Sequence, residues 1–302
     1  MVNQAQDMQD DGNAPGNALH AAASVPEPLT CRNDPELEAA VERILAATSG
    51  VWSIVARGTG GLPLFHDRLA DRVFPSASLI KILIMAEAFR QTEEGRLSLA
   101  DRLDAPADRI VPFGLLPLLR ERSYSIWDLI VYMMTVSDNT ATNLLIDRLG
   151  MASVNAFAER LGLSDTRLRR HMMDLEARRA HRENETSARD MARLLAGINA
   201  GRIVSASACQ VMRQMMENER GTDGLRRCFP AEWPMMRKTG ELEGIRHDLC
   251  IVQTPAGALL LGVLATELSD MREAERVTVA LGELIIGHAS GAQLNRHGGT
   301  PH

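Results

Sequence analysis

Lysine is almost missing from this chain of 302 residues, although the chain does not lack positive charge. Of its 33 lysine and arginine residues, only Lys81 and Lys238 are lysines. A guanidinium stays protonated at neutral pH, whereas a buried amine can lower its pKa and accept a proton. We therefore interpret both lysines as residues at positions where arginine cannot serve.

Aromatic residues, net positive charge and long apolar runs are also scarce. Aromatics make up 4% of the chain, too few for a platform on which nucleic-acid bases stack. The formal net charge of -6 gives no overall attraction to nucleic acid or anionic membranes. No apolar run is long enough to span a bilayer. We expect a monomer with a small-molecule substrate, and neither a nucleic-acid nor a membrane partner.

Cysteine and histidine are too scattered to indicate a metal or redox site. The 4 cysteines form no Cys-x-x-Cys pair; they are Cys31, Cys209, Cys228 and Cys250. His171, His181 and His247 show no ligand spacing. We expect free, mostly buried thiols, with one disulfide left open, and neither a metal nor a cofactor.

The N-terminal segment lacks the features of an export signal. Residues 1–30 contain no lysine or arginine, and the apolar patch 18–25 is short and interrupted by His20. A secretory signal needs a basic start and a continuous apolar stretch. We predict a disordered leader over 1–33 and a cytoplasmic protein, or a periplasmic or secreted one if a native signal has been removed.

Hydrophobic periodicity divides the chain into strands at both ends and helices between them. Helical patterns cover 36–48, 80–91, 126–136, 140–149, 153–161, 188–199, 206–218 and about 269–287. Extended patterns cover 51–57, 62–66, 235–238, 247–254 and 258–265. Three late strands make a poor sheet alone, so we expect them to join the first two.

This order predicts an α/β fold, an antiparallel-sheet α/β sandwich with an inserted all-helical domain. The sandwich is assigned to 34–74 and 226–288, the helical domain to 75–225, and a flexible tail to 289–302. A ligand site is expected where the two parts meet.

The first lysine belongs to the segment Phe-Pro-Ser-Ala-Ser-Leu-Ile-Lys, which ends at Lys81. Pro75 and Ser76 indicate a helix start with Ser76 as N-cap. Ser78 would then lie in the first turn, where the helix dipole favours oxyanion charge. Lys81 follows three residues later on the same face, and its apolar neighbours would lower its pKa so that a neutral amine can take the proton of a serine. Alone, however, Ser-x-x-Lys usually means a cap followed by a surface lysine.

Two further short motifs supply polar groups of the kind that acyl transfer needs. Ser137-Asp138-Asn139 follows a helix; its serine can pass a proton and its asparagine can bind a substrate carbonyl. The alternative is an ordinary interhelical turn with a capping residue. Lys238-Thr239-Gly240 is expected to end a strand, where Gly240 permits close backbone approach to a ligand.

Together, in this order, the three motifs resemble the set found in serine β-lactamases and penicillin-binding proteins. The stretch 137–150 is similar to class A in particular, and the resemblance covers about 36–288. It implies that Ser78 is the nucleophile and Lys81 its proton acceptor. It further implies that Ser137, assisted by Lys238, passes a proton to the leaving nitrogen, and that Asn139 holds the acyl side chain.

The same resemblance implies how a substrate would be held. The backbone N–H groups of Ser78 and Glu241 would form an oxyanion hole. Thr239 and Arg246 would bind a substrate carboxylate, and Gly240 would let the substrate approach the backbone closely.

The chain departs from the family at two places. Class A enzymes need a loop glutamate for deacylation, and Met172 stands at that position. Either Asp174 or Glu176 substitutes, or Lys81 or another route is used. Secondly, Glu241 and Glu243 replace small or neutral residues, and would repel an anionic substrate unless Arg237 or Arg246 pairs with them.

We therefore predict a metal-independent serine hydrolase that opens a β-lactam or related cyclic amide through an acyl-Ser78 intermediate. One alternative is an esterase or peptidase on the same scaffold. Another is a penicillin-binding protein or sensor that is acylated without turnover, which Met172 would favour.

Overall fold

A five-stranded antiparallel sheet forms the base of the fold in the computed structural model, which describes residues 33–59, 62 and 64–297. Its order is β2-β1-β9-β8-β7. The strands are β1 (Val51–Gly58), β2 (Phe65–Arg68), β7 (Met235–Leu242), β8 (Ile245–Thr254) and β9 (Gly257–Thr266). β1 pairs with β9 along its whole length, from Val51 opposite Thr266 to Gly58 opposite Leu259. The late strands therefore join the early ones, as predicted.

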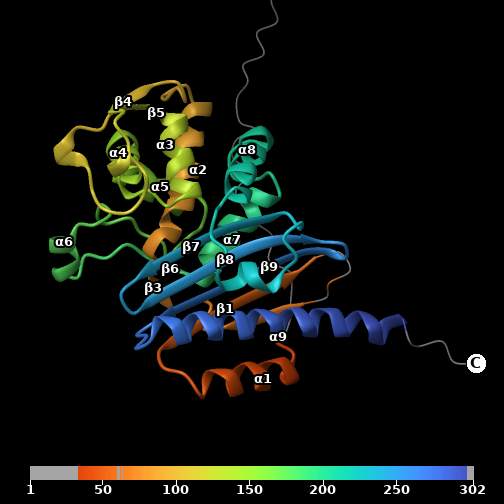
Figure 1. The fold of residues 1–302 in the computed structure, drawn as a ribbon. Coiled ribbons are helices and arrows are strands. Elements are labelled where there is room, and N and C mark those ends of the chain that lie inside the picture. Colours follow the sequence, from red (N-terminus) through yellow and green to blue (C-terminus); the bar gives the residue numbers. More distant parts are fainter. Residues whose placement is uncertain (1–32, 60–61, 63, 298–302) are drawn as a thin grey trace, which may run out of the picture.

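Two terminal helices cover one face of this sheet (Figure 1). They are α1 (Pro35–Leu45) and α9 (Met271–His297), and their apolar residues share a core with Trp52 and Ile54 of β1. The predicted end of the last helix near residue 287, followed by a flexible tail, is wrong, because α9 continues to His297. No proline occurs before Pro301 in this part of the chain, and the buried side chain of Ala289 still packs in the core.

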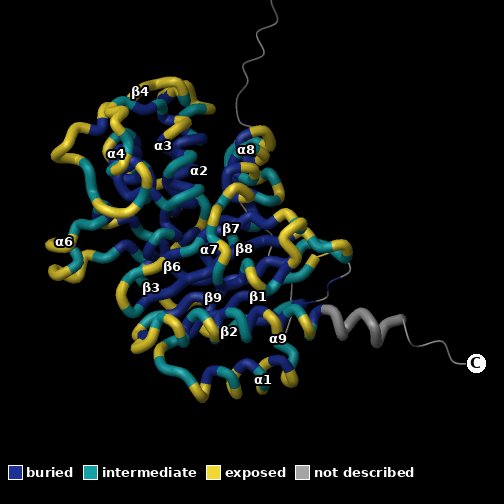
Figure 2. The backbone as a smooth tube through the Cα atoms, viewed as in Figure 1, coloured by how far each residue is buried: buried dark blue, intermediate teal, exposed yellow. Residues whose placement is uncertain are grey.

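The opposite face carries the helical part of the chain, which shares one continuous core with the sheet. Its helices are α2 (Ile80–Glu93), α3 (Ile126–Thr135), α4 (Asn139–Leu149), α5 (Met151–Arg160), α6 (Leu175–Arg179), α7 (Ala188–Asn199) and α8 (Ala206–Glu217). Every residue from Ile80 to Phe89 is buried, so α2 is the central helix of this layer. In Figure 2 most of β7, β8 and β9 is also coloured as buried.

The inserted part is not entirely helical. Two small sheets pair β3 (Val73–Pro75) with β6 (Glu185–Ser187), and β4 (Arg102–Asp104) with β5 (Ser123–Ser125). Strands of three residues are too short to produce a visible alternation, which is why the sequence pattern did not reveal them. The pairing of β3 with β6 fixes the chain directly before the first motif.

Predictions about the ends and the thiols have mixed outcomes. Residues 1–32 of the predicted leader lie outside the described residues, but Asn33 belongs to the fold. Its side chain donates to the Asp67 carbonyl at 2.7 Å and accepts from the Asp67 N–H at 2.9 Å.

Cys209, Cys228 and Cys250 are free thiols, while Cys31 lies outside the described residues. Within the described part of the chain, no helix is long and apolar enough to cross a membrane.

Candidate active site

Ser78 lies in a tight turn between β3 and α2, not in the first turn of an α-helix as predicted. The turn is the 3-10 helix η1 (Ala77–Leu79), and Ala77 has a left-handed backbone with φ of 45°. The Ser76 hydroxyl does not cap the helix but donates to the Ala77 carbonyl at 3.3 Å. A non-glycine residue at positive φ is strained, and such strain is found preferentially at functional sites. The half-buried Ser78 hydroxyl makes no hydrogen bond to any described residue.

Gly240 brings β7 against this turn. A Cβ atom at Gly240 would lie 3.0 Å from the Ala77 Cβ and 3.1 Å from the Ser78 nitrogen, so any other residue would require the turn to shift by a few tenths of an ångström. The prediction that Lys238-Thr239-Gly240 ends a strand is wrong, since β7 continues to Leu242. The strand therefore lies in close contact with the backbone of the turn that holds Ser78.

Lys81 is fully buried and contacts the second motif. Its Nζ lies 2.7 Å from the Ser137 carbonyl oxygen, 3.0 Å from Ser137 Oγ and 2.9 Å from Asn139 Oδ1. Burial lowers the pKa of Lys81 well below its usual value, and the nearby charge of Lys238 lowers it further, while Asp138 opposes the shift. A lysine whose pKa is lowered in this way gives up its proton more readily than an exposed lysine and can act as a base.

Ser137 lies between the two lysines. Lys238 Nζ is 3.2 Å from Ser137 Oγ and also donates to the Thr239 carbonyl at 3.1 Å. Burial is the main cause that lowers the pKa of Lys238 to about 8. Because the Ser137 oxygen accepts from both amines, its own hydrogen remains free to be donated to a third group.

The turn that holds Ser137 is built by Asp138. Its buried carboxylate accepts from the N–H of Ala141 at 2.8 Å, which caps α4, and from the N–H groups of Leu115 and Leu116 at 2.6 and 2.8 Å. Asp138 is thus the helix cap that the alternative interpretation of this motif expected, and this cap places Ser137 and Asn139 beside Lys81.

Both the oxygen and the nitrogen of the Asn139 side-chain amide make hydrogen bonds. The backbone of Asn139 also contacts Phe113, a residue that the sequence did not single out. Asn139 Nδ2 donates to the Pro112 carbonyl at 3.1 Å, and the Asn139 N–H donates to the Phe113 carbonyl at 3.1 Å. Phe113 is 71% exposed and has a left-handed backbone. This exposed aromatic ring beside the turn offers apolar surface to a ligand. The sequence contains only 6 phenylalanines, and this scarcity was the signal that could have drawn attention to Phe113.

The candidates for deacylation do not join this network. Asp174 caps the short helix α6 by accepting from the Ala177 N–H at 2.9 Å, and Glu176 is exposed on that helix. Among the described residues, neither makes a hydrogen bond to Ser78, Lys81 or Ser137. Met172 is buried.

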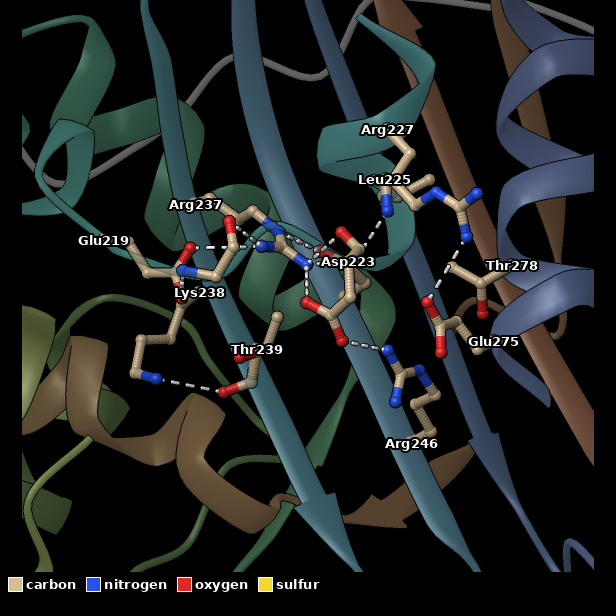
Figure 3. Close-up of polar contacts among 12 residues, drawn as sticks. Glu219, Asp223, Leu225, Arg227, Arg237, Lys238, Thr239, Arg246, Glu275 and Thr278 are labelled. Carbon is tan, nitrogen blue, oxygen red and sulfur yellow. Dashed lines mark hydrogen bonds and ion pairs between the residues drawn. The ribbon is translucent and has the colours of Figure 1, made fainter. Parts of the chain in front are cut away.

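Charged side chains of β7, of β8 and of the segment before β7 form ion pairs on the other face of β7. Figure 3 shows Arg237 and Arg246 reaching toward Asp223, while Lys238 extends away. Arg246 binds Glu241 at 3.0 Å and also pairs with Asp223, so the predicted pairing of Glu241 with Arg246 is confirmed. Arg237 instead binds Asp248 at 2.8 Å. The residues expected to hold a substrate carboxylate thus include an arginine that is already paired twice.

His247 and Asp248 point to opposite faces of β8, as alternation along a strand requires. His247 Nε2 donates to the Pro75 carbonyl at 2.7 Å, whereas Asp248 binds Arg237. Burial lowers the pKa of His247 to about 4, which keeps the imidazole neutral. The histidine therefore links β8 to the last residue of β3, two residues before the nucleophile turn, and forms no dyad with Asp248.

Known proteins share both the sequence and the fold described above. A family model described as "Beta-lactamase enzyme family" matches residues 36–289. A β-lactamase from Streptomyces fradiae is 29% identical over 260 residues, covering 83% of this chain and 84% of that protein. One from Rhodobacter capsulatus is 26% identical over 253 residues, covering 82% and 84%.

Solved structures give the same result. A β-lactamase from Sphaerobacter thermophilus is 29% identical, with a TM-score of 0.77, and covers 84% of this chain and 97% of that one. The protein PBP-A is 24% identical, with a TM-score of 0.78, and covers 86% and 98%; this similarity concerns the fold.

Proposed function

The chain belongs to the Beta-lactamase enzyme family, and from this premise we propose that it opens a β-lactam or related cyclic amide through an ester on Ser78. It is a serine hydrolase of the class A β-lactamase-like superfamily. One arrangement supports the assignment of roles above all: buried Lys81 and Lys238 both lie within hydrogen-bond distance of the same hydroxyl, that of Ser137. The chain has no other lysine.

Acylation would begin with attack of Ser78 Oγ on the carbonyl carbon of the substrate. The serine proton passes to the neutral amine of Lys81, which has a lone pair because burial has lowered its pKa. The N–H groups of Ser78 and Glu241, on segments that Gly240 allows to touch, would bind the oxyanion. Two backbone donors would thus stabilise the charge that develops on the carbonyl oxygen.

Collapse of the tetrahedral intermediate breaks the C–N bond. The leaving nitrogen takes the free hydrogen of the Ser137 hydroxyl, and Lys81 returns its proton to Ser137 across their 3.0 Å contact. The net transfer is one proton from Ser78 to the leaving nitrogen. The Lys238 ammonium, 3.2 Å from the same oxygen, stabilises the negative charge that develops there.

A second candidate function is acylation without turnover, as in a penicillin-binding protein or sensor. The observation that favours it is Met172, whose buried thioether cannot activate water. Asp174, Glu176 and Lys81 remain candidates for the deacylating base. Among the fold neighbours, a leucine-to-glutamate variant of PBP-A is described as an acyl-enzyme complex with penicillin G.

Intact-mass spectrometry of the protein with benzylpenicillin, followed over time together with ring opening, tests the proposal. We expect an adduct of the whole drug on Ser78 and none in the Ser78→Ala variant. Decay of the adduct with many turnovers means a β-lactamase, and its persistence means the acylation-only function. No adduct and an intact ring would refute the β-lactam assignment and point to esters or other amides.

A further inference from the structure

Arg246, the cation expected to hold a substrate carboxylate, is already bound by two carboxylates of this chain. Glu241 lies opposite Arg246 in the register of β7 and β8, and their side chains form an ion pair of 3.0 Å. A second guanidinium nitrogen pairs with Asp223. One guanidinium and two carboxylates leave this group with a net charge of about -1 when all three are ionised.

The two carboxylates are exposed to solvent, whereas the guanidinium of Arg246 is buried. The side chains of Glu241 and Asp223 are 60% and 42% exposed, whereas that of Arg246 is 9% exposed. The Arg246 Nε is buried and has no hydrogen-bond partner among the described residues. A ligand that approaches this end of β7 therefore meets acidic groups first.

The neighbouring cations are already engaged by groups of this chain. The side chain of Arg237 is 1% exposed and bound by Asp248, Glu219 and Asp223. Lys238 extends away from this group of charges (Figure 3), and its Nζ is held by Ser137 Oγ at 3.2 Å and the Thr239 carbonyl at 3.1 Å. A third carboxylate at this place would have to displace Glu241 or lie beside it, and like charges in close contact repel.

We propose that Glu241, through its ion pair with Arg246, makes the site select substrates that carry no carboxylate next to the scissile amide. Preferred substrates are neutral or cationic at that position, such as cyclic amides or esters whose acid group is absent or esterified. The inference rests on the proposed function, because it concerns what the same Ser78 site accepts.

Benzylpenicillin and its methyl ester test this directly, since they differ at the carboxylate in question. The rate constant for acylation of Ser78 is measured by intact mass for both compounds with the wild type, Glu241→Gln and Glu243→Gln. Glu241→Gln keeps the backbone N–H and nearly the same shape, but frees one side of Arg246. Glu243 is exposed and has no ion pair among the described residues, so it is the matched control for a change of charge.

We expect the ratio of acid to ester rates to rise about tenfold in Glu241→Gln, the size of one ordinary charge contact. It should change less than about threefold in Glu243→Gln, because an exposed charge is screened. The ratio between variants cancels the different intrinsic reactivity of the two compounds.

Equal ratios in all three proteins, with adducts present, would overturn the selectivity inference and leave the proposed function intact. Equal rises in Glu241→Gln and Glu243→Gln would also overturn it, since general charge and not the ion pair would then be responsible. Absence of any adduct together with an intact ring for both compounds would overturn the proposed function and the inference with it.

Discussion

Asn143 binds the main chain of Met172 from both sides. The Met172 N–H donates to Asn143 Oδ1 at 2.7 Å, and Asn143 Nδ2 donates to the Met172 carbonyl at 3.1 Å. Asn143 belongs to α4, the helix that begins at Asn139, so one helix positions both the polar turn and residue 172. The backbone at 172 is therefore held whatever its side chain, which makes this position suitable for substitution.

Met172→Glu should convert slow or absent deacylation into turnover. The carboxylate would supply the proton acceptor that a thioether lacks, and general bases contribute about 10²–10⁴-fold. The lifetime of the Ser78 adduct, measured by intact mass after removal of excess penicillin, should fall by at least about tenfold. Met172→Gln is the matched control, because it has similar shape and no base. Equal adduct lifetimes in both variants would mean that residue 172 does not face the ester.

Lys81→Arg should abolish acylation although the positive charge is kept. A guanidinium does not give up its proton at neutral pH, so Ser78 would lose its base. We expect acylation to slow by about 10²–10⁴-fold, as observed by intact mass with benzylpenicillin. Because Lys81 is fully buried, the larger arginine side chain could also destabilise the fold. The thermal unfolding of Lys81→Arg is therefore measured as well. The uncharged Lys81→Met variant serves as a second substitution that removes the base. A folded and active Lys81→Arg would refute the assignment of Lys81 as base.

The acylation rate should decline as the pH rises through about 8, where the Lys238 ammonium in the folded protein loses its proton. In Lys238→Arg this decline should move to higher pH, because the guanidinium stays charged. Rate constants for both proteins across this pH range provide the measurement. An unchanged decline in Lys238→Arg would assign it to another group.

The same shift in the pKa of Lys238 has a consequence for stability. The folded protein releases this proton near pH 8, whereas the unfolded chain keeps it until near the ordinary lysine value of 10.5. Between these values the unfolded state binds more protons, so this lysine makes the free energy of unfolding rise with pH. Its destabilising contribution is complete below about pH 8 and is relieved above it.

Gly240→Ala should disturb both stability and chemistry. Its new methyl group would lie 3.1 Å from the Ser78 nitrogen, so the nucleophile turn must move. We expect a loss of about 1–3 kcal/mol in the free energy of unfolding and slower acylation. Gly287→Ala is the control: it lies in α9, where an added methyl group would have no neighbour within 4 Å among the described residues, and should gain up to about 1 kcal/mol. Unchanged acylation in Gly240→Ala would mean that the contact is dispensable.

Which residues meet in the site was largely predictable from the sequence because the residue types that the proposed chemistry needs are constrained. Lys81, Ser137, Asn139 and Lys238, predicted from short motifs far apart in the chain, form one hydrogen-bonded network. Their roles depend on basicity and proton transfer, which only a few side chains provide. The scarcity of lysine sharpened the prediction further.

The local geometry was less predictable because tertiary contacts decide it. The turn of Ser78 depends on a left-handed alanine and on a strand that approaches from more than a hundred residues away, so the expected α-helix start was wrong. The position of Gly240 inside β7 likewise follows from its pairing with His247 of β8. The conformational propensity of a single residue carries no information on which distant strand will pack against it.

Lys81 and Lys238 are the two lysines of the chain, and both are buried in the site. Every other basic side chain of this protein is therefore a guanidinium or an imidazole. Amine-directed reagents, such as acetylating or carbamylating compounds, therefore find no third lysine to modify. Apart from the α-amino group of the chain, covalent amine labelling would occur only beside Ser137. Its rate would report how open the site is, and a bound substrate would protect both lysines at once.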